Sequence, residues 1–246
     1  MAGEYYRWLA KDVKPEEKRE LTKEEKIQNW WYYHKWHVLI AVVALFLVAD
    51  FVGDILRERR NQPDYSVAYV GSSYLPDDTV EQLKAALAEL GEDLNGNGKV
   101  QVAVHQYIAY SASGNVANSN DYSALYGAQV QLVADISNCD SFIFLLEEPR
   151  QFQTDYPVLI HMDGTFPETE EPSEKMYRSW TQCPVLAGLP LGEYTLETLD
   201  KIYTGTSQDI LQGLYVARRG FWEGENCENY EGKEALWNRL IQGAEN

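Results

Sequence analysis

The sequence predicts an α/β protein in which an amino-terminal transmembrane helix precedes one globular domain with a mainly parallel sheet. The first observation is an aromatic cluster at 30–37, WWYYHKWH, which runs directly into the uncharged apolar stretch 38–49. The second is an alternation of strand and helix patterns that starts at Tyr65. The third is the continuous apolar run at 141–146, which is typical of a strand buried on both faces of a parallel sheet.

The predicted membrane helix begins at a capping box, in which Thr22 and Glu25 can each accept the other's backbone N–H. The segment 36–56 has 21 residues, and about 20 apolar residues cross a bilayer core. Its Asp50 and Asp54 lie near one end, where a carboxylate reaches the headgroup layer at a lower cost than at mid-bilayer. Because Trp and Tyr rings concentrate at membrane interfaces, we expect a membrane anchor; the alternative is a buried core helix.

Basic residues on either side of this helix indicate its orientation. The amino-terminal side carries Lys18, Arg19, Lys23, Lys26 and Lys35, and the other side carries Arg57, Arg59 and Arg60. Because positive flanks favour the cytoplasm, we expect a single-pass protein of the cell membrane with its amino terminus inside and its domain outside. The predicted parts are a charged cytoplasmic tail at 1–21, the juxtamembrane and transmembrane helix at 22–56, a linker at 57–63 and an extracytoplasmic α/β domain at 64–246.

Charge limits the partners of that domain. Residues 57–246 hold 13 basic and 29 acidic side chains, a formal charge of −16. Such a domain repels phosphate backbones, so we expect no nucleic-acid partner. The acidity can attract cationic ligands or serve solubility alone.

Three cysteines do not decide the compartment. Their number is odd, and Cys139, Cys183 and Cys227 lack the close spacing of a zinc site. A disulfide between Cys183 and Cys227 and three small buried thiols are both compatible with the sequence.

From Tyr65 to Leu146 the pattern predicts strand, helix, strand, helix and strand. The strands are expected at 65–70, at 100–104, where Val alternates with polar residues, and at 141–146. Gly91 is expected to end the first helix. The helix faces carry Val80, Leu83, Ala86, Leu87 and Leu90 in the first, and Tyr122, Leu125, Leu132, Val133 and Ile136 in the second.

The remaining chain is less regular. We expect a strand at 157–160, an irregular loop rich in Pro and Glu at 166–173, a helix capped by Thr195, a strand at 213–217 and a closing helix at 231–241. The helix at Thr195 would present Leu196, Leu199 and Ile202.

The unit at 129–146, QVQLVADISNCDSFIFLL, leads from an amphipathic helix through an acidic turn into an apolar strand. With the preceding elements, residues 65–148 resemble the amino-terminal lobe of extracellular solute-binding proteins of bacterial import systems. The resemblance implies a periplasmic-binding-protein-like domain, truncated because the second lobe is not present at full length. The whole chain also resembles single-span membrane proteins of clostridial-type bacteria, which implies a location but no activity.

A ligand site is expected where parallel strands end, because α/β sheets bind ligands outside the carboxyl ends of their strands. Hydroxyls, an imidazole, a carboxylate and aromatics there suit peptides, sugars or polyamines. Two further candidates come from the pair of arginines beside aromatics at 218–222, although ion pairing within the protein is the favoured interpretation of those arginines. The candidate ligand-binding residues are Ser72, Ser73, Tyr74, His105, Tyr107, Glu147, Arg218 and Trp222.

The segment 93–100, DLNGNGKV, matches the first half of a calcium loop. Asp93, Asn95 and Asn97 supply oxygen at alternate positions, and Gly98 follows where the loop turns sharply. Position twelve is Val104 where a bidentate Glu is usual, so a plain Asn-Gly turn is the alternative. Apart from this calcium site, we expect no cofactor.

The sequence contains no recognised nucleophile, zinc or phosphate-loop motif, and its His161 and Asp163 have no partner nucleophile. We therefore expect a protein that is not an enzyme. One hypothesis is a membrane-anchored module that binds or senses a small molecule or peptide. The alternative is a structural or interaction subunit of a membrane complex that has lost ligand binding. In both, residues 36–56 contact the membrane, and another membrane protein is a candidate partner.

Overall fold

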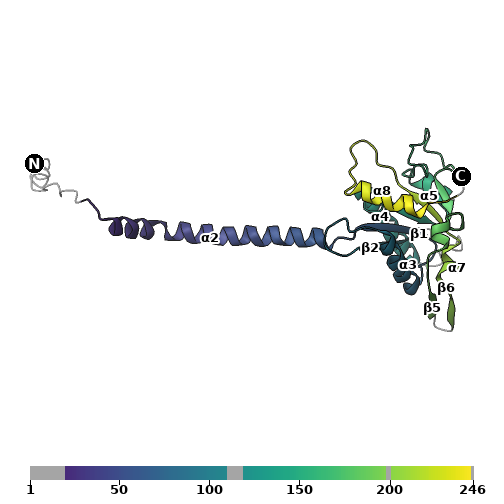
Figure 1. Cartoon of the computed structure of the whole chain (residues 1–246), viewed down its shortest axis with the longest axis horizontal. Coiled ribbons are helices and arrows are strands. Elements are labelled where there is room, and N and C mark those ends of the chain that lie inside the picture. The colour runs from purple at the N-terminus through teal and green to yellow at the C-terminus, as the bar shows by residue number, and fades with distance from the viewer. Residues whose placement is uncertain (1–19, 110–118, 198–200, 245–246) are drawn as a thin grey trace, which may run out of the picture. The chain divides into compact units, whose positions relative to one another are not determined.

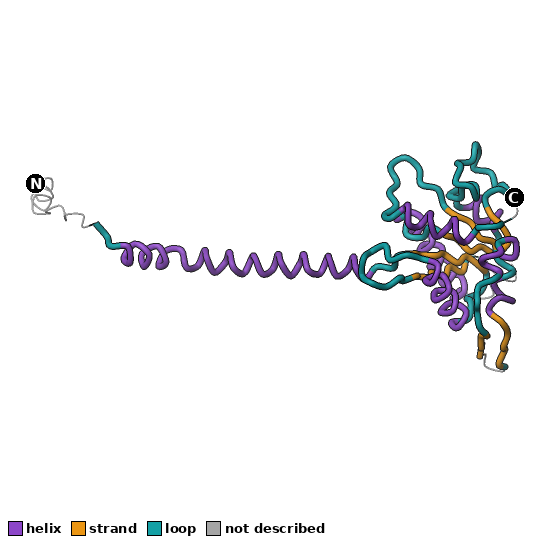
Figure 2. The backbone as a smooth tube through the Cα atoms, in the orientation of Figure 1, coloured by secondary structure: helices purple, strands orange, loops and turns teal. Residues whose placement is uncertain are grey.

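The computed structural model describes residues 20–109, 119–197 and 201–244, so most of the predicted tail at 1–21 lies outside the described residues. The chain forms two units, Met1–Arg57 and Glu58–Asn246. Figure 1 labels the helices and strands, and Figure 2 colours them by type.

Helix α2 (Lys23–Asn61) contains the predicted membrane segment and ends five residues later than predicted. Its capping box is present, because Thr22 N donates to Glu25 Oε2 at 2.9 Å and Glu25 N donates to Thr22 Oγ1 at 3.4 Å. Its most apolar stretch has a mean hydropathy of 2.5, and none of that stretch is buried. Trp30 stacks on His34 within the aromatic cluster, with ring centres 4.9 Å apart. The helix is thus long and apolar enough to cross a membrane, and its apolar side chains are not used in a protein core.

The second unit is built on a five-stranded sheet with the order β2-β1-β3-β7-β4. The parallel half contains β1 (Tyr65–Gly71), β2 (Val102–Ile108) and β3 (Ile143–Leu146). The other half contains β7 (Tyr215–Arg218), antiparallel to β3, and the edge strand β4 (Tyr177–Ser179), antiparallel to β7. The α/β class is confirmed, but the sheet is mixed where we expected it to be mainly parallel.

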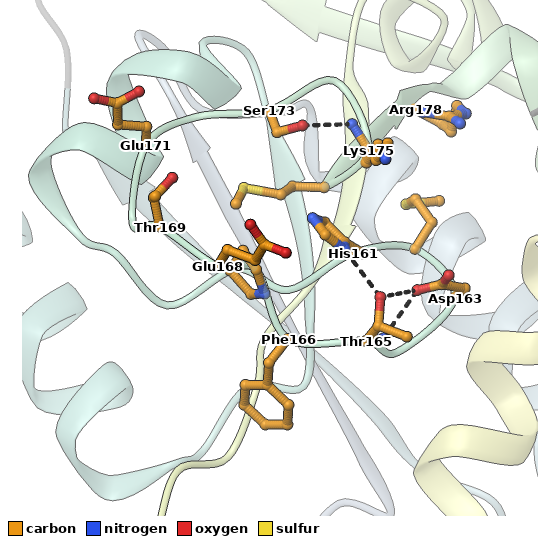
Figure 3. Close-up of a pocket in the computed structure, with 13 residues that line it drawn as sticks. His161, Asp163, Thr165, Phe166, Glu168, Thr169, Glu171, Ser173, Lys175 and Arg178 are labelled. Carbon is orange, nitrogen blue, oxygen red and sulfur yellow. Dashed lines mark hydrogen bonds between the residues drawn. The ribbon is translucent and has the colours of Figure 1, made fainter.

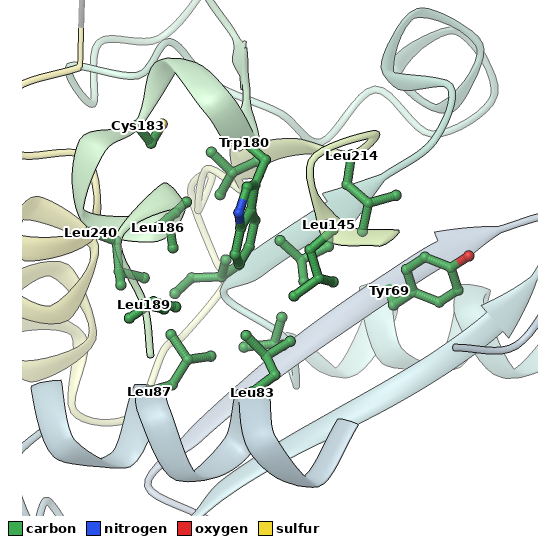
Figure 4. Packing of buried hydrophobic residues seen from close by; sticks show 14 of the residues in the cluster. Tyr69, Leu83, Leu87, Leu145, Trp180, Cys183, Leu186, Leu189, Leu214 and Leu240 are labelled. Atoms are coloured by element: carbon green, nitrogen blue, oxygen red, sulfur yellow. The ribbon is translucent and has the colours of Figure 1, made fainter. Parts of the chain in front are cut away.

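Helices cover both faces of this sheet, because its strands alternate between two apolar cores. One core joins Val67, Tyr69 and Leu145 to helices on the first face (Figure 4). Those helices are α3 (Asp77–Leu90), α6 (Pro184–Ala187), α7 (Ser207–Leu211) and α8 (Tyr230–Leu240). The other core joins Ala68 and Phe144 to α4 (Ser119–Asn138) and α5 (Pro149–Asp155). A single turn of 3-10 helix, η1 (Trp180–Gln182), follows β4.

The predicted helix at Thr195 is wrong. The segment forms a hairpin of β5 (Glu193–Glu197) and β6 (Ile202–Thr206), while Leu199 lies outside the described residues. Asp78 of α3 accepts the Thr195 N–H at 3.0 Å, and the Tyr194 ring lies over Gly205, where an added Cβ would be 2.9 Å from the ring. These tertiary contacts hold extended backbone where the local pattern favoured a helix.

Two other local predictions need correction. Residues 157–160 form only an isolated bridge between Leu159 and Arg219. Ile160 donates to the carbonyl of Arg218 at the end of β7, and Val158 accepts the Gly220 N–H just beyond it, so the pairing does not extend along a strand. The strand predicted at 100–104 is shifted to Val102–Ile108. The strand near 213–217, the closing helix and the irregular loop at 166–173 are confirmed.

Candidate functional site

The carboxyl ends of β1 and β3 meet at Glu147, as the topology predicts. The chain leaves β1 for β2 on one side and later returns to β3 on the other, so the switch point of the sheet lies between β1 and β3. The Ser72 N–H donates to Glu147 Oε2 at 2.8 Å. The Tyr69 hydroxyl lies 2.6 Å from Glu147 Oε1 and 2.8 Å from the Ser73 carbonyl oxygen. Burial, followed by the contact with Glu147, raises the pKa of Tyr69 above its usual range, so this hydroxyl stays protonated.

Gly71 is needed at this junction. A Cβ there would lie 2.2 Å from the Tyr69 hydroxyl oxygen and 2.7 Å from Glu147 Oε1. The Glu147 carboxylate thus accepts the Ser72 N–H, a backbone donor that an anionic ligand would otherwise use at a switch point. Ser73 and Tyr74 are exposed beside this junction, with Tyr74 67% exposed.

The two candidate residues on β2, His105 and Tyr107, face away from Glu147. Because side chains alternate along a strand, His105 and Tyr107 share the face that carries α4, opposite to the face of Tyr69. Their rings stack with centres 6.4 Å apart, and His105 is exposed. Tyr107 is buried, and its hydroxyl donates to Asp135 at 2.7 Å. Asp135 also accepts the Ser141 hydroxyl at 2.7 Å, so Tyr107 closes a structural network and is not available to a ligand at the switch point.

Arg218 and Trp222 lie toward the opposite end of the strands, near the amino end of β3. Arg218 pairs with Ile143 at the start of β3, whereas Glu147 follows its end. Arg218 is buried and ion-paired to Glu234 at 3.2 Å, and its guanidinium lies over the Phe142 ring at 5.1 Å. Trp222 is half exposed and packs edge-on against Phe166. The favoured interpretation of these arginines as internal ion-pair partners is confirmed, and the predicted ligand residues do not form one site.

The neighbouring Arg219 is equally buried. Its guanidinium pairs with Glu225 at 3.2 Å, donates to the Ile136 carbonyl at 2.8 Å and lies 4.8 Å from the Phe221 ring centre. Both charges are paired with carboxylates of the domain, as burial of a guanidinium requires, while the buried Nε of Arg218 has no hydrogen-bond partner among the described residues.

The calcium-like loop uses its oxygens on its own backbone. Asp93 accepts the N–H groups of Gly96 and Gly98, both at 2.7 Å, and these bonds lower its pKa. Asn95 and Asn97 each accept a backbone N–H two residues later, at 3.0 and 2.8 Å. The described parts of the chain also contain no group of three or more His, Cys, Asp or Glu side chains placed to share a metal ion. This geometry fits the alternative of a hydrogen-bonded turn.

A polar chain of side chains that the sequence did not fully indicate lies at 161–165 (Figure 3). Thr165 Oγ1 lies 2.9 Å from His161 Nδ1 and donates to Asp163 Oδ1 at 2.7 Å. These bonds from Thr165 lower the pKa of Asp163. The Thr165 hydroxyl is thus a candidate nucleophile beside His161 and Asp163. Its proton, however, is donated to Asp163, a carboxylate whose pKa is lowered, and not to the His161 imidazole. An activated nucleophile would donate its proton to the imidazole as the general base.

Two adjoining surface pockets lie along the edge strand β4. The larger, of about 830 Å³, is formed mainly by the loop 161–176 and is shown in Figure 3. The smaller, of about 500 Å³, lies between α5, β4 and β7. They share Lys175 and Arg178, and the smaller adds Arg150 from α5.

The smaller pocket reaches the edge of the sheet at which a site was predicted. Tyr215 and Ser179, which line it, pair with each other, and Tyr215 also pairs with Leu146 at the end of β3. An open pocket therefore lies at this end of the sheet, over β7 and β4 rather than over β1 and β2. Arg150, Lys175 and Arg178 form no recognised sequence motif. Because Arg150 lies far from the other two along the chain, the sequence did not group them.

The three cysteines are unpaired with one another. All are free thiols, and burial raises the pKa of Cys183 to about 11. The Cys183–Cys227 disulfide, one of the two alternatives, is absent from this structure.

No family model matches the sequence, and neither the curated proteins nor the solved structures contain a significant match.

Proposed function

We propose that this chain is a membrane-anchored module that binds or senses a small ligand outside the cytoplasm, with a fold related to one lobe of a solute-binding protein. The observation that carries the proposal is the pair of adjoining pockets along β4, of about 830 and 500 Å³. Both volumes fall in the range of small-molecule sites, about 300–1,000 Å³. The smaller pocket opens beside the carboxyl ends of the parallel strands, where α/β folds bind their ligands.

The membrane location is supported by α2, whose apolar residues are exposed beside a cluster of tryptophans and tyrosines. We place the amino terminus in the cytoplasm because more basic residues precede the apolar stretch than follow it. Protease added to intact cells should digest the domain at 64–246 if this orientation holds. Protection of the domain in intact cells, with digestion after lysis, would reverse the orientation.

The binding proposal is tested by thermal unfolding of the full chain in nanodiscs of neutral lipid. The ligands are a panel of amino acids, short peptides, sugars, polyamines and organic acids. A compound that binds the native state raises the unfolding midpoint in a saturable way. A folded protein that shifts with no member of the panel would contradict the proposal.

The second candidate is an interaction subunit that has lost ligand binding. It is favoured by Glu147, which fills the switch point and bonds to Tyr69 and the Ser72 N–H. Under this candidate, α2 and the domain surface contact another membrane protein, and crosslinking in cells should capture that partner in the absence of added ligand. We propose binding rather than catalysis because the Thr165 hydroxyl donates to Asp163 and not to His161.

A further inference from the structure

Building on the proposed binding function, we propose that the pocket between α5, β4 and β7 binds a small organic anion, a carboxylate or a phosphate ester. Arg150, Lys175 and Arg178 would hold its charged group. Guanidinium groups bind both oxyanions through paired N–H donors, so the two anions share one recognition chemistry.

The charge of the pocket is opposite to that of its surroundings. From Asp64 to Asn246 the chain carries 28 acidic and only 10 basic side chains. Two of those basic side chains, Arg218 and Arg219, are buried in internal ion pairs. Three of the remaining eight line this pocket, where Glu174 is the one carboxylate among the lining residues. The three cations give this pocket a locally positive field, which favours a bound anion against the negative charge of the rest of the domain.

Each cation is placed by a different element. Arg150 lies in the first turn of α5, Arg178 lies within β4, and Lys175 lies in the loop before β4. Arg178 Nη1 donates to the carbonyls of Glu174 and Tyr177, which fixes the guanidinium against the edge strand. Convergence of separate elements on one pocket is what a binding site requires, and it does not follow from a run of basic residues.

The existing ion pair in the pocket leaves room for a ligand. Arg150 contacts Glu174 at 3.2 Å, and the two side chains are 67% and 83% exposed. Exposed pairs of this kind contribute little to stability, so an anion with better geometry can displace Glu174. The Lys175 ammonium has no hydrogen bond or ion pair to the described residues, and Lys175 lines both pockets.

The walls favour an anion with a planar or apolar part. Tyr177 and Tyr215 pack edge to face, with ring centres 5.5 Å apart and planes at 88°. Ser179 lies beside them with a hydroxyl that can also donate to an oxyanion. A volume of about 500 Å³ admits a molecule the size of citrate or a sugar phosphate.

The test is calorimetric titration of the full chain in neutral-lipid nanodiscs. The probes are succinate, citrate, inorganic phosphate and glucose 6-phosphate, with glucose and putrescine as uncharged and cationic comparisons. Two double variants are compared with the wild type: Arg150→Gln with Arg178→Gln in the pocket, and Lys84→Gln with Lys99→Gln outside it, where Lys84 is half-buried and Lys99 is exposed. Both doubles remove two positive charges, so general electrostatics changes equally.

We expect at least one anionic probe to bind, to weaken with added salt, to lose at least tenfold in affinity in the pocket variant and to lose less than threefold in the Lys84 and Lys99 variant. Carboxylates and phosphates compared at equal charge decide which anion is preferred. Equal losses in the two doubles would overturn the site. Binding of glucose or putrescine alone would overturn the proposal that the pocket binds an anion and would leave the proposed binding function intact. Binding of no probe in this or the broader panel would overturn both the anion proposal and the proposed function.

One single variant should raise the affinity for the anion rather than lower it. Glu174→Gln removes the carboxylate that competes for Arg150. We expect it to tighten anion binding several-fold, which a purely structural role of these residues would not do. Unchanged or weaker binding in Glu174→Gln would contradict the proposed displacement.

Discussion

Two pairs of arginines in this domain lie in opposite environments. Arg218 and Arg219 are adjacent in sequence and both are buried, where carboxylates and aromatic rings of the domain surround them. Arg150 and Arg178 are distant in sequence, yet they line one open pocket on the edge strand. The adjacent pair attracts attention in the sequence and is structural, whereas the separated pair lines the open pocket that we propose as a ligand site.

The largest effect that would sharpen this comparison is expected at Arg218. Replacing it with Met removes the partner of Glu234 and leaves a carboxylate beside an apolar core. Because Glu234 keeps some contact with water, we expect a loss of about 3 kcal/mol, the lower end for a broken buried pair. Urea unfolding of the detergent-solubilised chain, followed by near-ultraviolet circular dichroism, measures it. A loss as small as that of a surface variant would remove the distinction between the two pairs.

The matched change in the other pair is Arg178→Gln. Its side chain is partly exposed, and two carbonyl contacts are lost. We expect a loss of unfolding free energy of less than about 1 kcal/mol, as for ordinary hydrogen bonds near the surface. The same urea titration gives the value, and a loss equal to that of Arg218→Met would show that Arg178 is also a core residue.

Glu147 should have an intermediate effect. Its replacement by Ala leaves the Tyr69 hydroxyl and the Ser72 N–H without their acceptor, which costs about 1–3 kcal/mol. Because a carboxylate normally fills this position, added acetate should partly restore the unfolding midpoint of the variant and should leave the wild type unchanged. Absence of rescue, with a stability loss near zero, would mean that Glu147 does not close the switch point.

The field of Arg178 should reach the core behind the pocket. Burial raises the pKa of Cys183 to about 11, while Arg178 acts in the opposite direction. Arg178→Gln should therefore raise this pKa further, as measured by the pH dependence of alkylation in a chain with Cys139→Ser and Cys227→Ser. An unchanged or lower pKa would show that Arg178 does not act on this thiol.

The same thiol gives a pH dependence of stability. The folded-state pKa of Cys183 is about 11 and the unfolded value is near 9.0, so the folded protein holds the proton more tightly. The contribution is complete below pH 9 and is lost as the pH rises toward 11. Cys183→Ala should remove this part of the alkaline loss in the thermal midpoint, and an identical alkaline profile would contradict it.

The smallest expected effect concerns calcium. Asp93 already accepts backbone N–H groups of its own loop, which orients the loop without a metal. We expect the same unfolding midpoint in chelator and in millimolar calcium. A saturable rise in calcium that is lost in Asp93→Asn would restore the calcium-site hypothesis.

Local patterns predicted the elements whose cause is local. The capping box at Thr22 and Glu25, the apolar helix that follows and the buried strand ending at Leu146 depend on spacing and hydrophobicity within one segment. The segment at Thr195 depends instead on Asp78 and on the packing of Tyr194 over Gly205, which its own sequence does not contain. For the same reason, Arg150 and Arg178 could not be grouped before β4 was placed beside β7.

The sequence alone determined that the chain carries one membrane-capable helix and an acidic α/β domain, because composition and periodicity depend only on residue type. It also predicted a ligand site at the carboxyl ends of the strands, which stays a prediction. Only the tertiary structure decided that Glu147 occupies the switch point, that Arg218 is internal and that an open cationic pocket lies on β4. The physical reason is that hydrogen bonding and burial depend on distances between segments far apart in the chain.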